Sequence, residues 1–181
     1  MKVIFLDIDG VLNTFETFKE INLEEQLTGF RRVAIDIDKV LLLKEIVEMT
    51  GAKLVLSSGW RKYGKMKDGR LVTKNQNLFD INRILNDNGL EIYDLVPYKR
   101  KESREVQIKK WLSKNLDVES FIIFDDEEFD LQSFIDQELL KTNFYMRDKN
   151  GDERPDLCGL TRNHVVEAIN KLNNSKQLIK I

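Results

Sequence analysis

Short apolar runs that end abruptly in polar residues constrain the fold of this chain more than any other feature. The clearest three cover residues 3–6, 54–56 and 121–124. The first is rich in β-branched and aromatic side chains, and all three are apolar and too short for helices, so each predicts a buried strand of a parallel sheet. In open α/β sheets, ligands bind in the crevice outside the carboxyl ends of the strands. The functional residues are therefore expected directly after these runs.

Helical patterns alternate with the apolar runs. Apolar residues recur at helical spacing in four segments, which are residues 38–49, 78–88, 103–115 and 161–172. Two further strands are expected at residues 89–96 and 139–146, whereas residues 13–32 and 64–75 are expected to be polar and irregular. Alternating strands and helices predict right-handed crossovers and a doubly wound, mainly parallel sheet in a three-layer α/β/α sandwich.

The composition of the chain narrows the function classes. Its 29 Lys and Arg residues nearly balance its 31 Asp and Glu residues, which leaves no global basic field typical of nucleic-acid binders. One cysteine, Cys158, and one histidine, His164, exclude an internal disulfide and zinc sites built from several Cys or His side chains. No apolar stretch approaches the ~20 residues of a membrane span, and no leader segment is recognisable. We expect one cytoplasmic domain, residues 1–181, with no membrane contact, no obligate protein partner and a polar tail after Asn173.

Two aspartates follow the first apolar run. Strand alternation places Asp7 and Asp9 on the same side of the strand. Like charges this close repel each other, and a buried carboxylate is costly unless it is paired or bound to a metal. Mg²⁺ prefers oxygen ligands and takes one or two protein carboxylates, so these residues are candidate metal ligands; a solvated acidic turn is the alternative. A second such pair, Asp36 and Asp38, precedes a helix and is explained by helix capping.

The segment Asp-Ile-Asp-Gly-Val-Leu-Asn, residues 7–13, resembles the first motif of the haloacid dehalogenase (HAD) superfamily. The resemblance implies a HAD-like Rossmannoid fold. It also implies that Asp7 is a nucleophile that forms an aspartyl-phosphate. Asp9 would act first as general acid and then as general base.

The end of the second apolar run resembles the second motif of the superfamily. Ser57 directly follows this run and is favoured over Ser58 as the hydroxyl that hydrogen-bonds a phosphate oxygen. The backbone amides of Ser58 and Gly59 would add donors to the phosphate. An ordinary helix cap is the alternative explanation of this serine.

The end of the third apolar run resembles the acidic fourth motif. Asp126 is the first choice, and Asp125 the second, for the aspartate that completes the Mg²⁺ site. The resemblance implies that the other two ligands are Asp7 and the backbone carbonyl of Asp9. As a third possibility, Asp130 only caps the helix that follows it.

The third motif of the superfamily supplies a basic residue near the start of a helix. Its candidates here are Lys99, Arg100, Lys101 and Arg104. Arg104 begins a segment similar to the Arg-x-x-Glu-Ile-x-x-Trp-Leu pattern of one HAD subgroup, although Gln107 stands where Glu is usual. The resemblance implies that the basic residue offsets phosphate charge and steadies the nucleophilic aspartate.

Together these segments are most similar to the HAD domains of Swiss-army-knife RNA-repair proteins. The resemblance implies a Mg²⁺-dependent phosphomonoester hydrolase; a catalytically silent binding module and a phosphotransferase are the alternatives. The intervals between motifs leave no room for a large cap, so an open site would admit a small phosphorylated molecule, a phosphoprotein or a nucleic-acid end. Basic and aromatic residues lie just past Ser57, and these are Trp60, Arg61, Lys62, Tyr63 and Lys65. Arg61 and Lys101 are the candidate substrate-binding cations.

Overall fold

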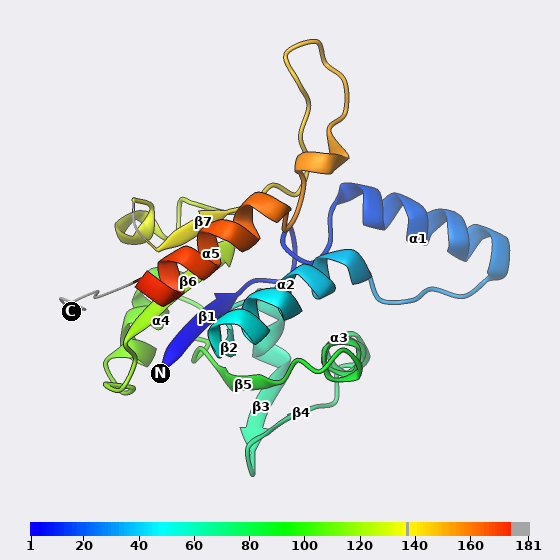
Figure 1. Cartoon of the computed structure of the whole chain (residues 1–181). Coiled ribbons are helices and arrows are strands. Elements are labelled where there is room, and N and C mark those ends of the chain that lie inside the picture. The colour runs from blue at the N-terminus through cyan, green and yellow to red at the C-terminus, as the bar shows by residue number, and fades with distance from the viewer. Residues whose placement is uncertain (137, 175–181) are drawn as a thin grey trace.

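The computed structural model describes residues 1–136 and 138–174, and its centre is a five-stranded parallel sheet. The sheet has the order β5-β2-β1-β6-β7 (Figure 1). Its strands are β1 (Lys2–Leu6), β2 (Lys53–Leu56), β5 (Ile92–Leu95), β6 (Ser120–Asp125) and β7 (Leu139–Lys141). All four strand pairs are parallel, which confirms the predicted sheet. The polar tail predicted after Asn173 lies, from residue 175 on, outside the described residues.

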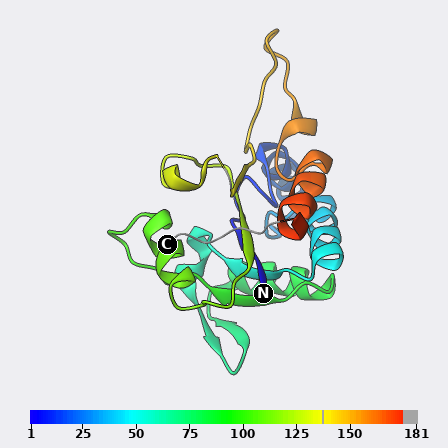
Figure 2. The same cartoon turned by 60° about the vertical axis from the view of Figure 1, so that its left-hand side comes forward.

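Helices cover both faces of the sheet (Figures 1 and 2). They are α2 (Ile37–Thr50), α3 (Gln76–Asp87) and α5 (Arg162–Asn174) on one face, and α4 (Arg104–Leu112) on the other. The alternation of β1 builds both cores, because Ile4 packs under the first group of helices and Phe5 under α4. The Phe5 ring meets Trp111 of α4 edge-on at 5.3 Å between ring centroids. The predicted three-layer α/β/α sandwich is confirmed.

One predicted irregular stretch, residues 13–32, contains the helix α1 (Phe15–Thr28), so that prediction is wrong. Thr14 and Thr17 form a capping box, in which each side chain accepts from the backbone N–H of the other. Gly29 ends the helix at a φ of 72°. Only Thr17 and Ile21 are buried. The helix therefore lacks the apolar stripe from which helices are recognised in sequence.

The second predicted irregular stretch, residues 64–75, is also regular. After the 3₁₀ helix η1 (Gly59–Tyr63) come β3 (Gly64–Lys67) and β4 (Arg70–Thr73), which pair antiparallel. The turn residues Asp68 and Gly69 both have positive φ, of 51° and 73°, as a tight hairpin turn requires. The hairpin projects from the body of the molecule (Figure 1).

The last strand of the sheet is shorter than predicted. The strand expected at residues 139–146 ends at Lys141, and residues 143–158 form a protruding arm closed by a bridge between Arg147 and Glu153 (Figure 2). Two short 3₁₀ helices, η2 (Gln132–Phe134) and η3 (Pro155–Leu157), complete the elements. Across the described part of the chain, no helix has the length and apolarity to cross a membrane.

Candidate active site

Polar residues follow three neighbouring strands, β1, β2 and β6, and lie side by side at one edge of the sheet. Leu6 of β1 pairs with Leu56 of β2 on one side and with Phe124 of β6 on the other. The residues that follow these partners are Asp7, Ser57 and Asp125. The chain runs outward from β1 to β2 and β5, then returns to the other side of β1 as β6. This reversal of strand order is the place where open α/β sheets bind ligands.

A cluster of three carboxylates lies at this edge of the sheet. Asp7, Asp125 and Asp126 each present an oxygen within 4.8 Å of the others. Asp7 and Asp125 are buried, and Asp126 is half-buried. The loop after β1 approaches Asp126 so closely that a Cβ atom at Gly10 would lie 2.6 Å from the Cβ of Asp126. Gly10 also has a φ of 74°, so both its backbone and its surroundings require glycine.

Arg104 joins two of these carboxylates. Its Nη1 donates to Oδ2 of Asp7 at 2.6 Å and also to Oδ2 of Asp125. Burial by itself would lower the pKa of Arg104, but the charges of Asp7 and Asp125 outweigh burial and raise it. Arg104 is fixed at the first position of α4, where its backbone N–H donates to Oδ2 of Asp130 at 2.7 Å. Asp130 therefore caps the helix before it in the sequence, which corrects the expectation that it caps the following one.

The charges of the cluster fit a divalent cation. Three carboxylates face one guanidinium, which leaves a net charge of −2 if all are ionised. Burial and the charge of Asp7 raise the pKa of Asp125 well above its usual range and raise that of Asp126 to about 6. A set of oxygen donors with excess negative charge suits a hard cation such as Mg²⁺.

Asp125 and Asp126 differ in their free oxygens. The oxygens of Asp125 accept from Arg104 and, at 3.0 Å, from the backbone N–H of Glu127. Those of Asp126 accept no hydrogen bond from any other residue in the described ranges. This difference favours Asp126 over Asp125 as the metal ligand.

Asp9 lies outside the three-carboxylate cluster and has its own partners. Its Oδ1 accepts from Nδ2 of Asn13 at 2.9 Å, and its Oδ2 accepts from Nε1 of Trp60 at 3.0 Å. Burial raises the pKa of Asp9, while the bonds from Asn13 and Trp60 act in the opposite direction. Asn13 also accepts from the Gly10 N–H and donates to the carbonyl of Ala34. Sequence reasoning missed Asn13, although its place four residues after Asp9 is compatible with a contact across one turn.

Asp9 opens into a cavity of about 190 Å³ between the linker that follows α1, η1 and α3. Its lining mixes apolar and polar side chains, which are those of Asp9, Asn13, Phe18, Arg31, Arg32, Val33, Ala34, Trp60, Asn77 and Ile81. A group larger than phosphate therefore has room beside Asp9.

The two serines after β2 have different surroundings. The hydroxyl of Ser57 is buried and has no hydrogen-bond partner in the described parts of the chain. Ser58 Oγ accepts from the backbone N–H of Trp60 at 3.4 Å and so caps η1, which begins at the exposed Gly59. A buried hydroxyl left unpaired costs about 1–3 kcal/mol, so Ser57 is the residue with a hydrogen bond still to make.

Arg61 is buried and its guanidinium forms four hydrogen bonds within the protein. It donates to the carbonyls of Ser57, Ser58 and Val96, and to Oε1 of Gln107 at 2.6 Å. Burial and the nearby charge of Arg104 lower the pKa of Arg61 to about 10, so it stays charged at neutral pH. Its substrate-binding role stays a prediction, and these contacts favour a role in positioning the loops.

The remaining basic candidates lie in the loop between β5 and α4. Lys99, Arg100 and Lys101 are exposed, and Lys99 pairs with Glu102 at 2.5 Å. Of the four third-motif candidates, Arg104 is the one that contacts the carboxylates. Lys101 as a substrate-binding residue stays a prediction.

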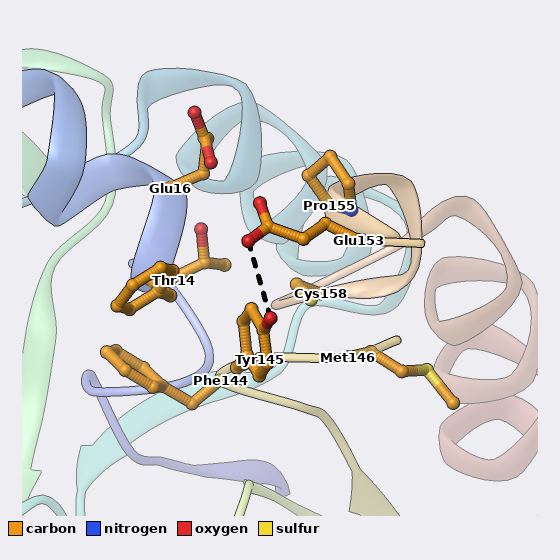
Figure 3. Close-up of a pocket in the computed structure, with 9 residues that line it drawn as sticks. Thr14, Glu16, Phe144, Tyr145, Met146, Glu153, Pro155 and Cys158 are labelled. Atoms are coloured by element: carbon orange, nitrogen blue, oxygen red, sulfur yellow. Dashed lines mark hydrogen bonds between the residues drawn. The ribbon is translucent and has the colours of Figure 1, made fainter. Parts of the chain in front are cut away.

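A second, much smaller cavity lies where the arm meets the start of α1. It is lined by Thr14, Phe144, Tyr145 and Cys158 among others, and the hydroxyl of Tyr145 bonds Oε1 of Glu153 at 3.3 Å across its rim (Figure 3). Its volume of about 10 Å³ holds no more than a water molecule. None of the predicted site residues lines it.

A comparison with protein families places this chain beside a known family. A model described as "HAD domain in Swiss Army Knife RNA repair proteins" matches residues 3–147. This range contains all four strand-end and helix-start segments described above. No curated protein and no solved structure matches the chain.

Proposed function

Because the chain belongs to the family of HAD domains in Swiss Army Knife RNA repair proteins, we propose that it is a Mg²⁺-dependent phosphomonoester hydrolase acting through an aspartyl-phosphate. The observation that carries the proposal is that Asp7, Asp125 and Ser57 lie next to one another at the ends of three paired strands. An acidic cluster suited to a cation and a buried hydroxyl without a partner follow three paired strands. A phosphate group bound there would give Ser57 its missing hydrogen bond.

In the proposed first step, an oxygen of Asp7 attacks the phosphorus atom and the bond to the leaving oxygen breaks. Each Asp7 oxygen accepts one hydrogen bond in the structure, from Arg104 or from the Ile8 N–H, and a carboxylate oxygen has lone pairs to spare. Arg104 and Ser57 would hold the equatorial oxygens in line for attack. Mg²⁺, held by Asp7, Asp126 and the backbone of Asp9, would supply positive charge against the transferring phosphoryl group.

Asp9 would donate a proton to the leaving oxygen and later take one from water as the aspartyl-phosphate is hydrolysed. The direction of its pKa supports the acid role, because burial favours the protonated form. The cavity beside Asp9 would receive the part of the leaving alcohol that adjoins the phosphate. Asn13 and Trp60 keep both Asp9 oxygens oriented during these transfers.

We further propose that the substrate is a nucleotide or nucleic-acid phosphate end. The description of the family names RNA repair proteins, and the 190 Å³ cavity is of a size that suits a small organic group. The insertions after β1 and β2 amount to α1 and one hairpin among the described residues, which keeps the site open. A panel of 3′- and 5′-phosphorylated oligonucleotides would identify the preferred end.

The test is Asp7→Asn, assayed with p-nitrophenyl phosphate and Mg²⁺. We expect turnover to fall by more than about a thousandfold and the covalent phosphoenzyme to disappear, because the amide is a poor nucleophile. Asp38→Asn is the matched control, since this exposed aspartate at the start of α2 lies outside the site. Retained turnover in Asp7→Asn would contradict the nucleophile, and turnover that persists in EDTA would contradict the metal.

A further inference from the structure

Positive charge is concentrated in one short segment of this acidic chain. Residues 60–75 hold six basic side chains and one acidic side chain, a net charge of +5, whereas the whole chain has a net charge of −2. The basic side chains are those of Arg61, Lys62, Lys65, Lys67, Arg70 and Lys74, and the acid is Asp68. This segment forms η1 and the projecting β3–β4 hairpin (Figures 1 and 2).

The hairpin presents three of these cations on one face. Lys65 and Lys67 alternate with the half-buried Met66 along β3, and Arg70 lies directly opposite Lys67 on β4. Residues two apart on a strand and residues opposite each other in a pair share a face. Lys65, Lys67 and Arg70 are exposed and form no ion pair within residues 1–136 and 138–174. We call these three residues the basic hairpin face.

A groove of about 390 Å³ is lined by Lys65 of this face and by residues 94–98, at and just after the end of β5. Its lining includes Lys62 and Lys65, and also Pro97 and Tyr98, which follow β5. Arg61 also lines the groove and donates to the carbonyl of Ser57, so the groove lies near the candidate phosphate site.

The groove also offers an aromatic surface. The Tyr98 side chain is half exposed, and the Arg61 guanidinium lies 5.5 Å from the centre of its ring. The one acidic side chain in the lining, Asp94, accepts from Nε1 of Trp111 at 2.7 Å. Cations spaced along a groove together with an exposed aromatic ring are the features that bind single-stranded nucleic acids without sequence preference.

We propose that the groove and the basic hairpin face bind a single-stranded nucleic acid whose terminal phosphate lies at Asp7. The position of that terminus rests on the proposed function. The four residues of β3 span about 13 Å, which corresponds to about four nucleotides at the 3.4 Å repeat of a stacked strand. Under this proposal, a mononucleotide would occupy only the site at Asp7. The contribution of the hairpin should therefore grow with chain length up to about this number of nucleotides.

The experiment measures binding separately from turnover. Fluorescence anisotropy with a labelled, phosphorylated eight-nucleotide RNA, without Mg²⁺, is compared for the wild type and for Lys65→Gln/Lys67→Gln/Arg70→Gln. We expect binding at least about tenfold weaker at 50 mM salt, because three phosphate contacts are lost. The slope of log Kd against log salt should become less steep by about 2, since each contact with a single strand contributes about 0.7.

The matched control removes three charges elsewhere. Lys53, Lys114 and Lys149 are exposed and form no ion pair in the described residues, and Lys53 lies at the opposite end of β2 from the site. Lys53→Gln/Lys114→Gln/Lys149→Gln should bind the RNA like the wild type. The proposal would be overturned if both triple substitutions weakened RNA binding equally, or if the hairpin variant bound the RNA like the wild type. It would also be overturned if polyglutamate competed for the protein as well as RNA does.

Kinetics separate this proposal from the proposed function. The hairpin variant should hydrolyse p-nitrophenyl phosphate and a mononucleotide like the wild type, but should lose kcat/KM about tenfold on the eight-nucleotide substrate. If the wild type hydrolyses none of these substrates, the proposed function is contradicted. The anisotropy result still decides whether the binding surface exists. Hydrolysis with no length-dependent loss in the variant would contradict the surface alone.

Discussion

The substitution Gly10→Ala tests how the loop after β1 is built around the acidic cluster. Alanine at this position meets two penalties. The φ of 74° is a left-handed conformation that costs a residue with a Cβ atom about 1–2 kcal/mol. The new Cβ would also lie 2.6 Å from the Cβ of Asp126, about 1 Å inside normal carbon contact. Because the Cβ of Asp126 is fixed by its backbone, rotation of the carboxylate cannot relieve this overlap.

Gly29→Ala separates the two penalties. Gly29 has a φ of 72°, and a Cβ atom there would meet nothing within 4 Å. We expect Gly29→Ala to lower the free energy of unfolding by about 1–2 kcal/mol. Gly10→Ala should lower it by a further 1–3 kcal/mol, roughly the cost of overpacking a closed site. Urea unfolding of both variants with EDTA present measures the difference.

The same pair of variants reports on the metal site. Displacement of Asp126 should weaken Mg²⁺ binding by about tenfold or more in Gly10→Ala, a typical cost of disturbing the groups around a metal. Gly29→Ala should bind Mg²⁺ like the wild type, as measured by isothermal titration calorimetry. Equal stability losses and equal Mg²⁺ affinities in the two variants would refute the contact between Gly10 and Asp126.

Three further predictions concern the polar residues of the site. Ser57→Ala should lower kcat/KM about a hundredfold with no loss of stability, whereas Ser58→Ala should cost about 1 kcal/mol of stability with little change in kcat/KM. Arg104→Met should lower the free energy of unfolding by about 3–5 kcal/mol at pH 7.5, because two buried carboxylates lose their cation. The loss should be smaller at pH 5, and an unchanged urea midpoint would contradict this. The pKa of Asp126, raised from 3.8 to about 6, means that stability without metal falls as pH rises through 6. Thermal shifts should therefore show Mg²⁺ stabilising the protein more at pH 7.5 than at pH 5.

Much of the fold could be predicted because the buried strands carry their own signal. Residues 3–6 and 121–124 are apolar on both faces, as a strand with helices on each side must be. The helix α1 gave no such signal, because its apolar residues do not form a buried stripe and two of them, Leu23 and Leu27, are exposed. The hairpin was missed because polar residues dominate it, although Asp68-Gly69 is a typical signal for a tight turn.

The strand-end residues of the site were predictable for a related reason. Asp7, Ser57 and Asp125 are brought together by the register of the sheet alone. The partners of these residues are a different case. The contact of Trp60 with Asp9 and that of Asp130 with the start of α4 join segments 51 and 26 residues apart. Such contacts depend on how loops pack, which no local pattern in the sequence reports.

The amide of Gln107 has a consequence for how the protein ages. Its Oε1 accepts from Arg61, while its Nε2 donates to the carbonyls of Lys99 and Glu102 at 3.0 and 2.6 Å. Spontaneous deamidation would turn this side chain into a carboxylate, which keeps the bond from Arg61 but has no hydrogen to donate. Aged molecules would thus release the loop of residues 99–102 while the acidic cluster stayed intact.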